Sequence, residues 1–177
     1  MSVIVDHLIT VNSTVTNNPA SVTINGSDGI TFGASGALTG TTVTNNGSIV
    51  MTSGGTLTIA NGGTLTNNAT FTGGAGTVTF AGSGTISGTV GFYNVNIAGG
   101  VEFGTASTIN GTLQINNGGF VRTTCPTYAT NSTLAYNAGA TFNRGNEWTT
   151  NSLNLPFNVT VLQGTTLNLD VKDRKST

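Results

Sequence analysis

The chain has 177 residues, enough for one domain of ordinary size, and a formal net charge of −1. Hydrophobic residues make up 36% of it and charged residues only 6%, against about 25% charged residues in a typical soluble protein. No basic stripe is available for phosphates and no apolar run is long enough to span a bilayer, so we expect neither nucleic-acid binding nor membrane insertion.

A ten-residue pattern recurs along the chain. It alternates polar and apolar residues, continues into small residues rich in Gly and Asn, and ends on another apolar residue. Its copies are SVTINGSDGI (21–30), TLTIANGGTL (56–65), TVTFAGSGTI (77–86), NVNIAGGVEF (94–103) and TLQINNGGFV (112–121). The last four copies begin 21, 17 and 18 residues apart, and the gap of 35 residues after the first leaves room for two units. A further pair, TVTNNGSI (42–49) and TLTNNATF (64–71), is offset by 22 residues.

The local chemistry of this pattern predicts short stacked strands. Apolar residues at i and i+2 form a strand with one inward face, and Gly and Asn then turn the chain because they tolerate positive φ. We therefore predict an all-β fold: a parallel β-solenoid of about 8–9 short rungs, formed by residues 1–171 as a single domain. An antiparallel β-sandwich is the alternative. The residues expected to point inward and stack in columns are Leu57, Ile59, Val78, Phe80, Val95, Ile97, Leu113 and Ile115.

The composition changes after residue 122. Five aromatic residues and two of the three prolines lie within 123–160, which we interpret as an ornamented turn of the same solenoid. Residues 172–177 form a charged stretch, expected to be a solvated tail or a cut end.

Two segments resemble a known class of repeat proteins. VGFYNVNIAGGVEFGTASTINGTLQINNGG (90–119) and STLAYNAGATFNRGNEWTTNSLNLPFNVTVLQGTTLNL (132–169) are similar to repeat regions of large secreted, adhesin-like surface proteins of Bacteroidetes-type bacteria. The resemblance implies a β-solenoid exported by the type IX route, an extracellular or cell-surface location, an adhesive or scaffold role, and no reaction. The sequence shows neither a signal peptide nor the family's C-terminal sorting domain, so we expect either a fragment of a longer protein or an engineered chain.

Titratable residues are scattered singly. The carboxylates are Asp6, Asp28, Glu102, Glu147, Asp170 and Asp173. None forms an i, i+2 pair on one strand, and one Cys with one His cannot make a zinc site. We therefore expect no cofactor, no metal and no catalysis, and a polysaccharide-acting β-helix enzyme is the less favoured alternative. Cys125 is expected to be a small buried hydrophobe, since its only basic candidate, His7, is distant in sequence.

The densest cluster of functional side chains is Arg144, Glu147 and Trp148. One interpretation is a glycan contact, with the indole ring as a stacking platform and the two charged groups making hydrogen bonds. The other, which we favour, is structural: Arg144 and Glu147 hold a long turn while Trp148 covers the core.

Thr-x-Thr triplets suggest a second binding surface. On a strand the two threonines share the outward face, and a stacked threonine array would resemble that of ice-binding solenoids. The triplets start at residues 42, 56, 64, 70 and 77, which are 14, 8, 6 and 7 residues apart. A regular array needs a constant rung length, so this uneven spacing argues against ice binding.

Taken together, these features predict an extracellular structural or adhesive element: a fibre, stalk or adhesin segment. The alternative class is a binding module for glycans or ice. The expected partners are further copies of the chain in head-to-tail contact, neighbouring repeats of a longer chain, or surface glycans. Head-to-tail contact is expected because open solenoid ends expose unpaired strand edges.

Overall fold

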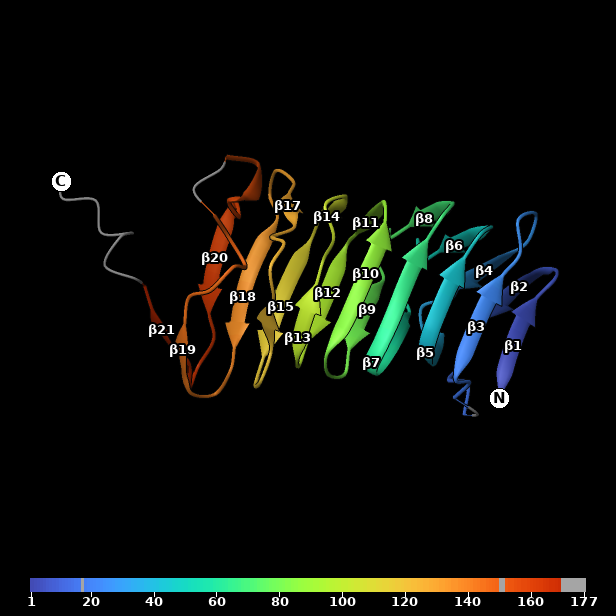
Figure 1. Ribbon diagram of the computed structural model, residues 1–177, viewed down its shortest axis with the longest axis horizontal. Helices are drawn as coiled ribbons and strands as arrows, with labels where there is room; N and C mark the ends of the chain where they lie inside the picture. Colours follow the sequence, from blue (N-terminus) through green and yellow to red (C-terminus); the bar gives the residue numbers. More distant parts are fainter. Residues whose placement is uncertain (17, 150–151, 170–177) are drawn as a thin grey trace.

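The computed structural model describes residues 1–16, 18–149 and 152–169. The strands stack along the long axis of the molecule, and the N-terminal strands lie at the opposite end from the last ones (Figure 1). Every strand pair between the described residues is parallel. The fold is a parallel β-solenoid of about eight turns. The predicted fold class is thus confirmed, and the parallel pairing excludes the antiparallel sandwich.

Three columns of strands form the walls of the solenoid. Two of them are joined in one large sheet, because two long strands, β5 (Ala37–Asn45) and β7 (Thr56–Asn67), contribute their first half to one column and their second half to the other. The first column continues with β9 (Thr77–Phe80), β12 (Asn94–Ile97), β15 (Thr112–Asn116), β18 (Thr133–Asn137) and β20 (Asn158–Val161).

The second column contains the second halves of β5 and β7 and five further strands. β1 (Ser2–Val5) and β3 (Ser21–Ile24) stack before these halves, and β10 (Gly84–Gly88), β13 (Gly100–Glu102) and β16 (Phe120–Val121) stack after them. A separate pair, β19 (Thr141–Asn143) and β21 (Thr166–Asn168), occupies the same place in the last turns. Each strand of that pair starts eight residues after the start of a first-column strand, as β16 does after β15.

The third column is divided into two sheets. One contains β2 (Leu8–Val11), β4 (Gly29–Phe32), β6 (Ser48–Val50) and β8 (Thr70–Thr72); the other contains β11 (Val90–Phe92), β14 (Ser107–Ile109) and β17 (Thr127–Tyr128). A single 3₁₀ turn, η1 (Ser152–Asn154), is the only helix among the described residues. None of the described helical segments has the length and apolar character needed to cross a membrane.

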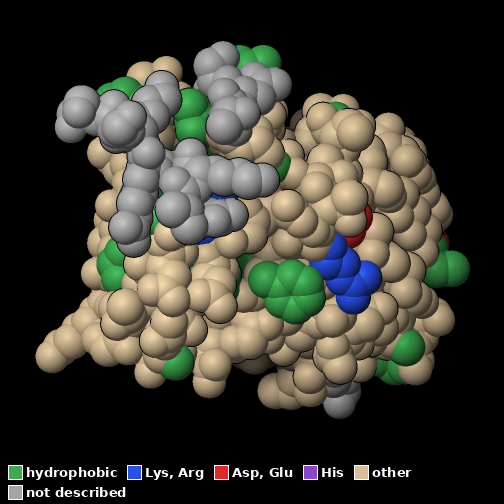
Figure 2. Space-filling model, turned by 60° about the vertical axis from the view of Figure 1, so that its left-hand side comes forward, with side chains coloured by type: hydrophobic (Ala, Val, Ile, Leu, Met, Phe, Trp, Pro, Cys, Tyr) green, Lys and Arg blue, Asp and Glu red, His purple; other side chains and the backbone are tan. Residues whose placement is uncertain are grey.

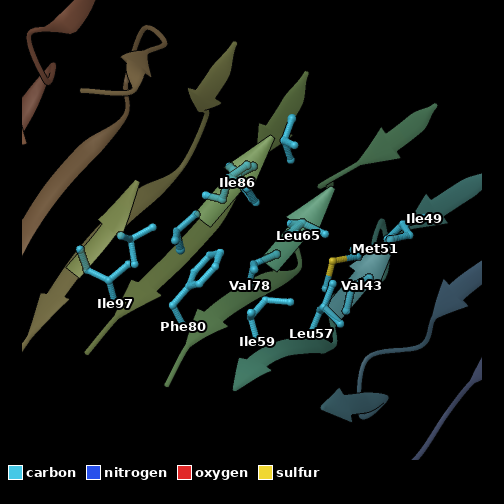
Figure 3. Packing of buried hydrophobic residues seen from close by; sticks show 14 of the residues in the cluster. Val43, Ile49, Met51, Leu57, Ile59, Leu65, Val78, Phe80, Ile86 and Ile97 are labelled. Carbon is cyan, nitrogen blue, oxygen red and sulfur yellow. The ribbon is translucent and has the colours of Figure 1, made fainter. Parts of the chain in front are cut away.

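The core lies between the columns, and the eight residues predicted to point inward are all buried. They stack in two files, which are Leu57–Val78–Val95–Leu113 and Ile59–Phe80–Ile97–Ile115. Figure 3 shows several of these side chains facing the same interior space as Leu65 and Ile86 from the second column. Because each apolar residue contacts its equivalents above and below, rungs that are too short to be stable alone stabilise one another.

The repeat assignment needs one correction. The sequence pattern predicts that residues 21–24 belong to the same column as the copies that begin at 56, 77, 94 and 112. They belong instead to the second column, paired with 42–45, whereas the other four copies lie in the first column. Strands of both columns carry the same polar–apolar alternation, so sequence similarity alone does not separate them. The offset pair at 42 and 64 is confirmed as in-register neighbours.

Glycine makes the turn between the first two columns. Equivalent turns carry positive φ at Gly62, Gly118, Gly139 and Gly164, with values of 74°, 80°, 64° and 82°. These angles lie in the left-handed region that side chains with a Cβ atom avoid. The predicted turn chemistry is thus present in these rungs.

Residues 123–160, predicted to be an ornamented turn region, contain β17 to β19, η1 and most of β20. β18 pairs with β15 on one side and with β20 on the other, so this region continues the same stack. What distinguishes this region is the long connection 144–157, between β19 and β20. The predicted charged tail, 172–177, lies outside the described residues.

Candidate functional site

The long connection encloses a carboxylate. The Glu147 side chain has no exposed surface, and its carboxylate accepts a hydrogen bond from the Tyr136 hydroxyl at 2.7 Å. The backbone N–H of Gly145 donates to both carboxylate oxygens, at 3.0 and 2.9 Å. These donors compensate for the hydration that the buried group has lost.

The backbone carbonyl of the same residue is also bound from inside the solenoid. Tyr128 donates its hydroxyl to the carbonyl oxygen of Glu147 at 2.6 Å, and the Cys125 sulfur lies 3.2 Å from that oxygen. Burial raises the pKa of the Tyr128 phenol, and the nearby Cys125 and Glu147 raise it further. The pKa of the Tyr136 phenol is likewise raised, first by burial and then by the Glu147 carboxylate. Both phenols therefore act as hydrogen-bond donors.

Cys125, expected to be buried, is half-buried against the core, and its thiol is protonated in this environment. Burial, and secondarily the Glu147 charge, raises its pKa to about 12. A thiol is a nucleophile only as the thiolate, so these surroundings suppress nucleophilic reactivity. Folding does not bring the histidine near: His7 lies between β1 and β2 in the first turn, while Cys125 precedes β17 towards the other end (Figure 1).

The 3₁₀ turn η1 attaches the long connection to the segment just before β17. Asn154 donates its side-chain amide to the carbonyl of Pro126 at 3.0 Å and to that of Cys125 at 3.4 Å. Its own carbonyl accepts from the N–H of Thr149 at 3.3 Å. The loop is therefore held against the strand that carries Tyr128.

The predicted site residues Arg144 and Trp148 contact each other. The guanidinium donates to the Trp148 carbonyl at 3.1 Å, and its central carbon lies 5.5 Å from the centre of the indole ring, which is within cation–π range. Both side chains are half-buried, and Trp148 packs against the core.

The three predicted residues thus lie in one loop, but they do not form one open surface. The carboxylate of Glu147 is enclosed by protein donors, so in this structure it is not placed to accept hydrogen bonds from a glycan. The sequence indicated the cluster through the closeness of the three residues in the chain, yet nothing in it showed that Tyr136 would reach Glu147.

A second carboxylate caps a turn. Glu102 accepts the backbone N–H groups of Thr123 at 3.1 Å and Thr124 at 2.9 Å. Partial burial opposes ionisation of Glu102, but the hydrogen bonds from Thr124 and Thr123 outweigh it and lower the pKa. Within the described part of the chain, no three His, Cys, Asp or Glu residues come close enough to hold a metal ion.

The structure sorts the Thr-x-Thr triplets onto three columns. Those at 42 and 64 are in register in the second column, those at 56 and 77 are in register in the first, and the one at 70 lies in the third. The spacing between successive triplets is uneven because successive triplets along the chain belong to different columns. The argument from that spacing against a regular array is therefore wrong.

The second column carries an unbroken Ser/Thr lattice, which we call the hydroxyl face. Its members are Ser21, Thr23, Thr42, Thr44, Thr64, Thr66, Thr85 and Ser87, two on each of four successive rungs. Strand spacing places neighbours about 4.8 Å apart across rungs, and the strand rise places them about 6.7 Å apart along each strand. The hydroxyl of Ser87 lies 3.1 Å from that of Thr66.

Two features were not found from the sequence. Asn45 and Asn67 are buried and form a ladder, in which the Asn45 amide donates to the Asn67 side-chain oxygen at 2.6 Å. Asn67 in turn donates to the carbonyl of Thr89 at 2.6 Å. Their position on the inward side, in register, could have indicated this ladder.

The second feature is an apolar hollow of about 310 Å³ in the first turns. Its lining includes Val3, Val5, Ile9, Val11 and Val15. These are core-type residues that no preceding rung covers among the described residues.

A search for similar proteins found no matching family model, no matching curated protein and no matching solved structure.

Proposed function

We propose that the chain is an extracellular structural element: a segment of a cell-surface stalk, fibre or adhesin. The observation that carries this proposal is the continuous stack, in which one parallel rung contact repeats along the whole long axis (Figure 1). Such an architecture gives a rod whose length is set by the number of rungs.

The surface chemistry supports the same role. No charged residue lies between Asp28 and Glu102, and charged side chains cover only a small part of the face in Figure 2. The resemblance to secreted surface repeats of Bacteroidetes-type bacteria supports the proposed location and the type IX export route.

Surface labelling tests this proposal. Antibodies raised against the chain should bind intact, unpermeabilised cells of the source organism or the medium around them, and surface proteolysis should remove the signal. Antigen that is protected in intact cells and released only on lysis would contradict an extracellular role.

The hydroxyl face favours a second candidate function, binding to ice. A hydroxyl both donates and accepts hydrogen bonds, and β-branched threonines on paired strands have few rotamers, so the lattice is rigid. Water molecules on the faces of an ice crystal form a neutral lattice with repeats of similar size. A glycan contact at Arg144 and Trp148 also stays a prediction.

Ice-growth assays test the second candidate. The wild-type chain should inhibit recrystallisation or shape growing crystals, and Thr42→Lys, in the centre of the hydroxyl face, should abolish the effect. The matched control is Thr31→Lys, which changes another exposed threonine, on β4 in the third column. Equal activity of the two variants, or no activity of the wild type, would contradict ice binding by this face.

A further inference from the structure

Large exposed apolar side chains gather at the two ends of the stack. At the N-terminal end they are Met1, Ile4, Leu8 and Ile9; at the C-terminal end they are Leu153, Leu155, Phe157, Val159, Val161, Leu162 and Leu169. Only Tyr93 and Phe120 among the described large exposed hydrophobics lie elsewhere. Burying such surface is the main favourable term in protein association.

The backbone at both ends also lacks partners on one side. β1 and β2 begin their sheets, and β20 and β21 end theirs, among the described strands. An edge strand presents a row of N–H and C=O groups that can pair with another strand. Each end thus offers apolar side chains together with open hydrogen-bonding groups.

The two ends match each other in strand order. In the first turn, β1 occupies the second column, and Thr14 bridges to Ala37 in the first. In the last turn, β20 occupies the first column, and β21 takes the second-column place. If the N-terminal end of a second copy stacks on the C-terminal end of the first, the first-column strands of the two copies therefore become neighbours, and so do their second-column strands.

The side-chain alternation matches as well. In the second-column place, Thr166-Leu167-Asn168-Leu169 carries an apolar residue at every second position, as Ser2-Val3-Ile4-Val5 does with Val3 and Val5. In the first column, Val159 would face Val15. The apolar hollow of the first turns lies on this contact.

From these observations we infer that the C-terminal rung of one copy of this chain docks on the N-terminal hollow of a second copy and continues the solenoid across the contact. The contact extends the interface that already joins every rung inside the molecule. It is head-to-tail, so each copy keeps one free end and the assembly propagates as a filament. This inference rests on the proposed structural function and names its partner.

Two end-blocking variants test the contact. Ile9, 42% exposed, lines the hollow, and Val161, 43% exposed, lies on β20. Ile9→Lys and Val161→Lys each place a charge in the proposed interface, where its desolvation is unfavourable. Wild-type chain should show a sedimentation mass that rises with concentration, whereas each variant alone should stay at the mass of one chain.

Mixing the two variants is the decisive measurement. The intact C-terminal end of Ile9→Lys can dock on the intact N-terminal end of Val161→Lys, so a 1:1 mixture should give dimers and nothing larger. Tyr93→Lys is the matched control, since Tyr93 is 43% exposed, as Val161 is, but lies between β11 and β12, away from both ends. It should assemble as the wild type does. Milder substitutions, Ile9→Ser and Val161→Thr, serve if circular dichroism shows that a lysine variant is unfolded.

Three results would overturn the inference: a wild-type chain that stays monomeric at high concentration, variants that assemble as the wild type does, or a mixture without dimers. Each leaves the proposed surface role standing, because a monomeric solenoid can still be a spacer. Antigen confined to the cell interior would instead contradict that role without bearing on the docking contact.

Discussion

The Tyr136–Glu147 hydrogen bond should be the main polar stabiliser of the C-terminal turns. Tyr136→Phe removes a donor 2.7 Å from a fully buried carboxylate and leaves that oxygen with Gly145 alone. A hydrogen bond to a charged group contributes about 1.5–3 kcal/mol, and more is lost when the charge stays buried. We therefore expect a destabilisation of about 2–3 kcal/mol.

Urea unfolding followed by two probes measures this cost. Trp148 is the only tryptophan in the chain and lies in the same loop as Glu147, so its fluorescence reports the C-terminal turns, while far-ultraviolet circular dichroism reports the whole stack. With a slope of about 2 kcal/mol per M urea, the fluorescence midpoint should fall by about 1 M. The two probes can diverge, because solenoid turns need not unfold together.

A double-mutant cycle with Glu147→Gln isolates the pair. The two single substitutions should be non-additive by about 1–2 kcal/mol, as expected for residues in direct contact. Tyr93→Phe is the control, because Tyr93 is 43% exposed and should change stability by no more than about 0.5 kcal/mol. If Tyr136→Phe costs no more than this control, or if the cycle is additive, the pair does not stabilise the loop.

Three further predictions concern buried polar groups. Because the folded-state pKa values of Tyr128 and Tyr136 are raised, stability should be fully present below the unfolded tyrosine pKa of about 10 and should fall above it by about 1.4 kcal/mol per pH unit for each, as urea midpoints against pH would show. The Cys125 thiol, with its pKa near 12, should react with a disulfide reagent at pH 8 on the order of a hundredfold more slowly in the folded chain than in urea, and equal rates would refute its burial as a thiol. Asn67→Ala should cost about 2–3 kcal/mol by breaking the buried amide ladder. The exposed control Asn68→Ala should cost under about 1 kcal/mol, and a reversed order in thermal melts would contradict the ladder's role.

The sequence determined the fold class and much of the core. Alternating residues such as Val95 and Ile97 predict a strand with one inward face wherever they occur, because side chains in a strand point to opposite faces in turn. Gly at the turns gives the chain the positive φ that a tight corner requires. These are local properties, which is why eight inward positions could be named without a structure.

Only the tertiary structure decided which strands are neighbours. The segments at 21 and 56 look alike in sequence but lie in different columns. A strand with this polar–apolar alternation can pack in either column, so the alternation does not distinguish them. Register depends on the length of the whole turn, including its loops, and that length varies along the chain. The hydroxyl face could be recognised only after the rungs were aligned.

The tertiary structure also decided the environment of Glu147. In sequence, a glutamate beside Arg144 and Trp148 suits an exposed glycan contact as well as an enclosed structural role. Its burial follows from the loop's closure through Asn154 and from the hydroxyl of Tyr136 on β18, which lies 11 residues earlier in the chain. Such contacts across the interior depend on the path of the chain in space, and the alternation that predicts each strand carries no information about that path.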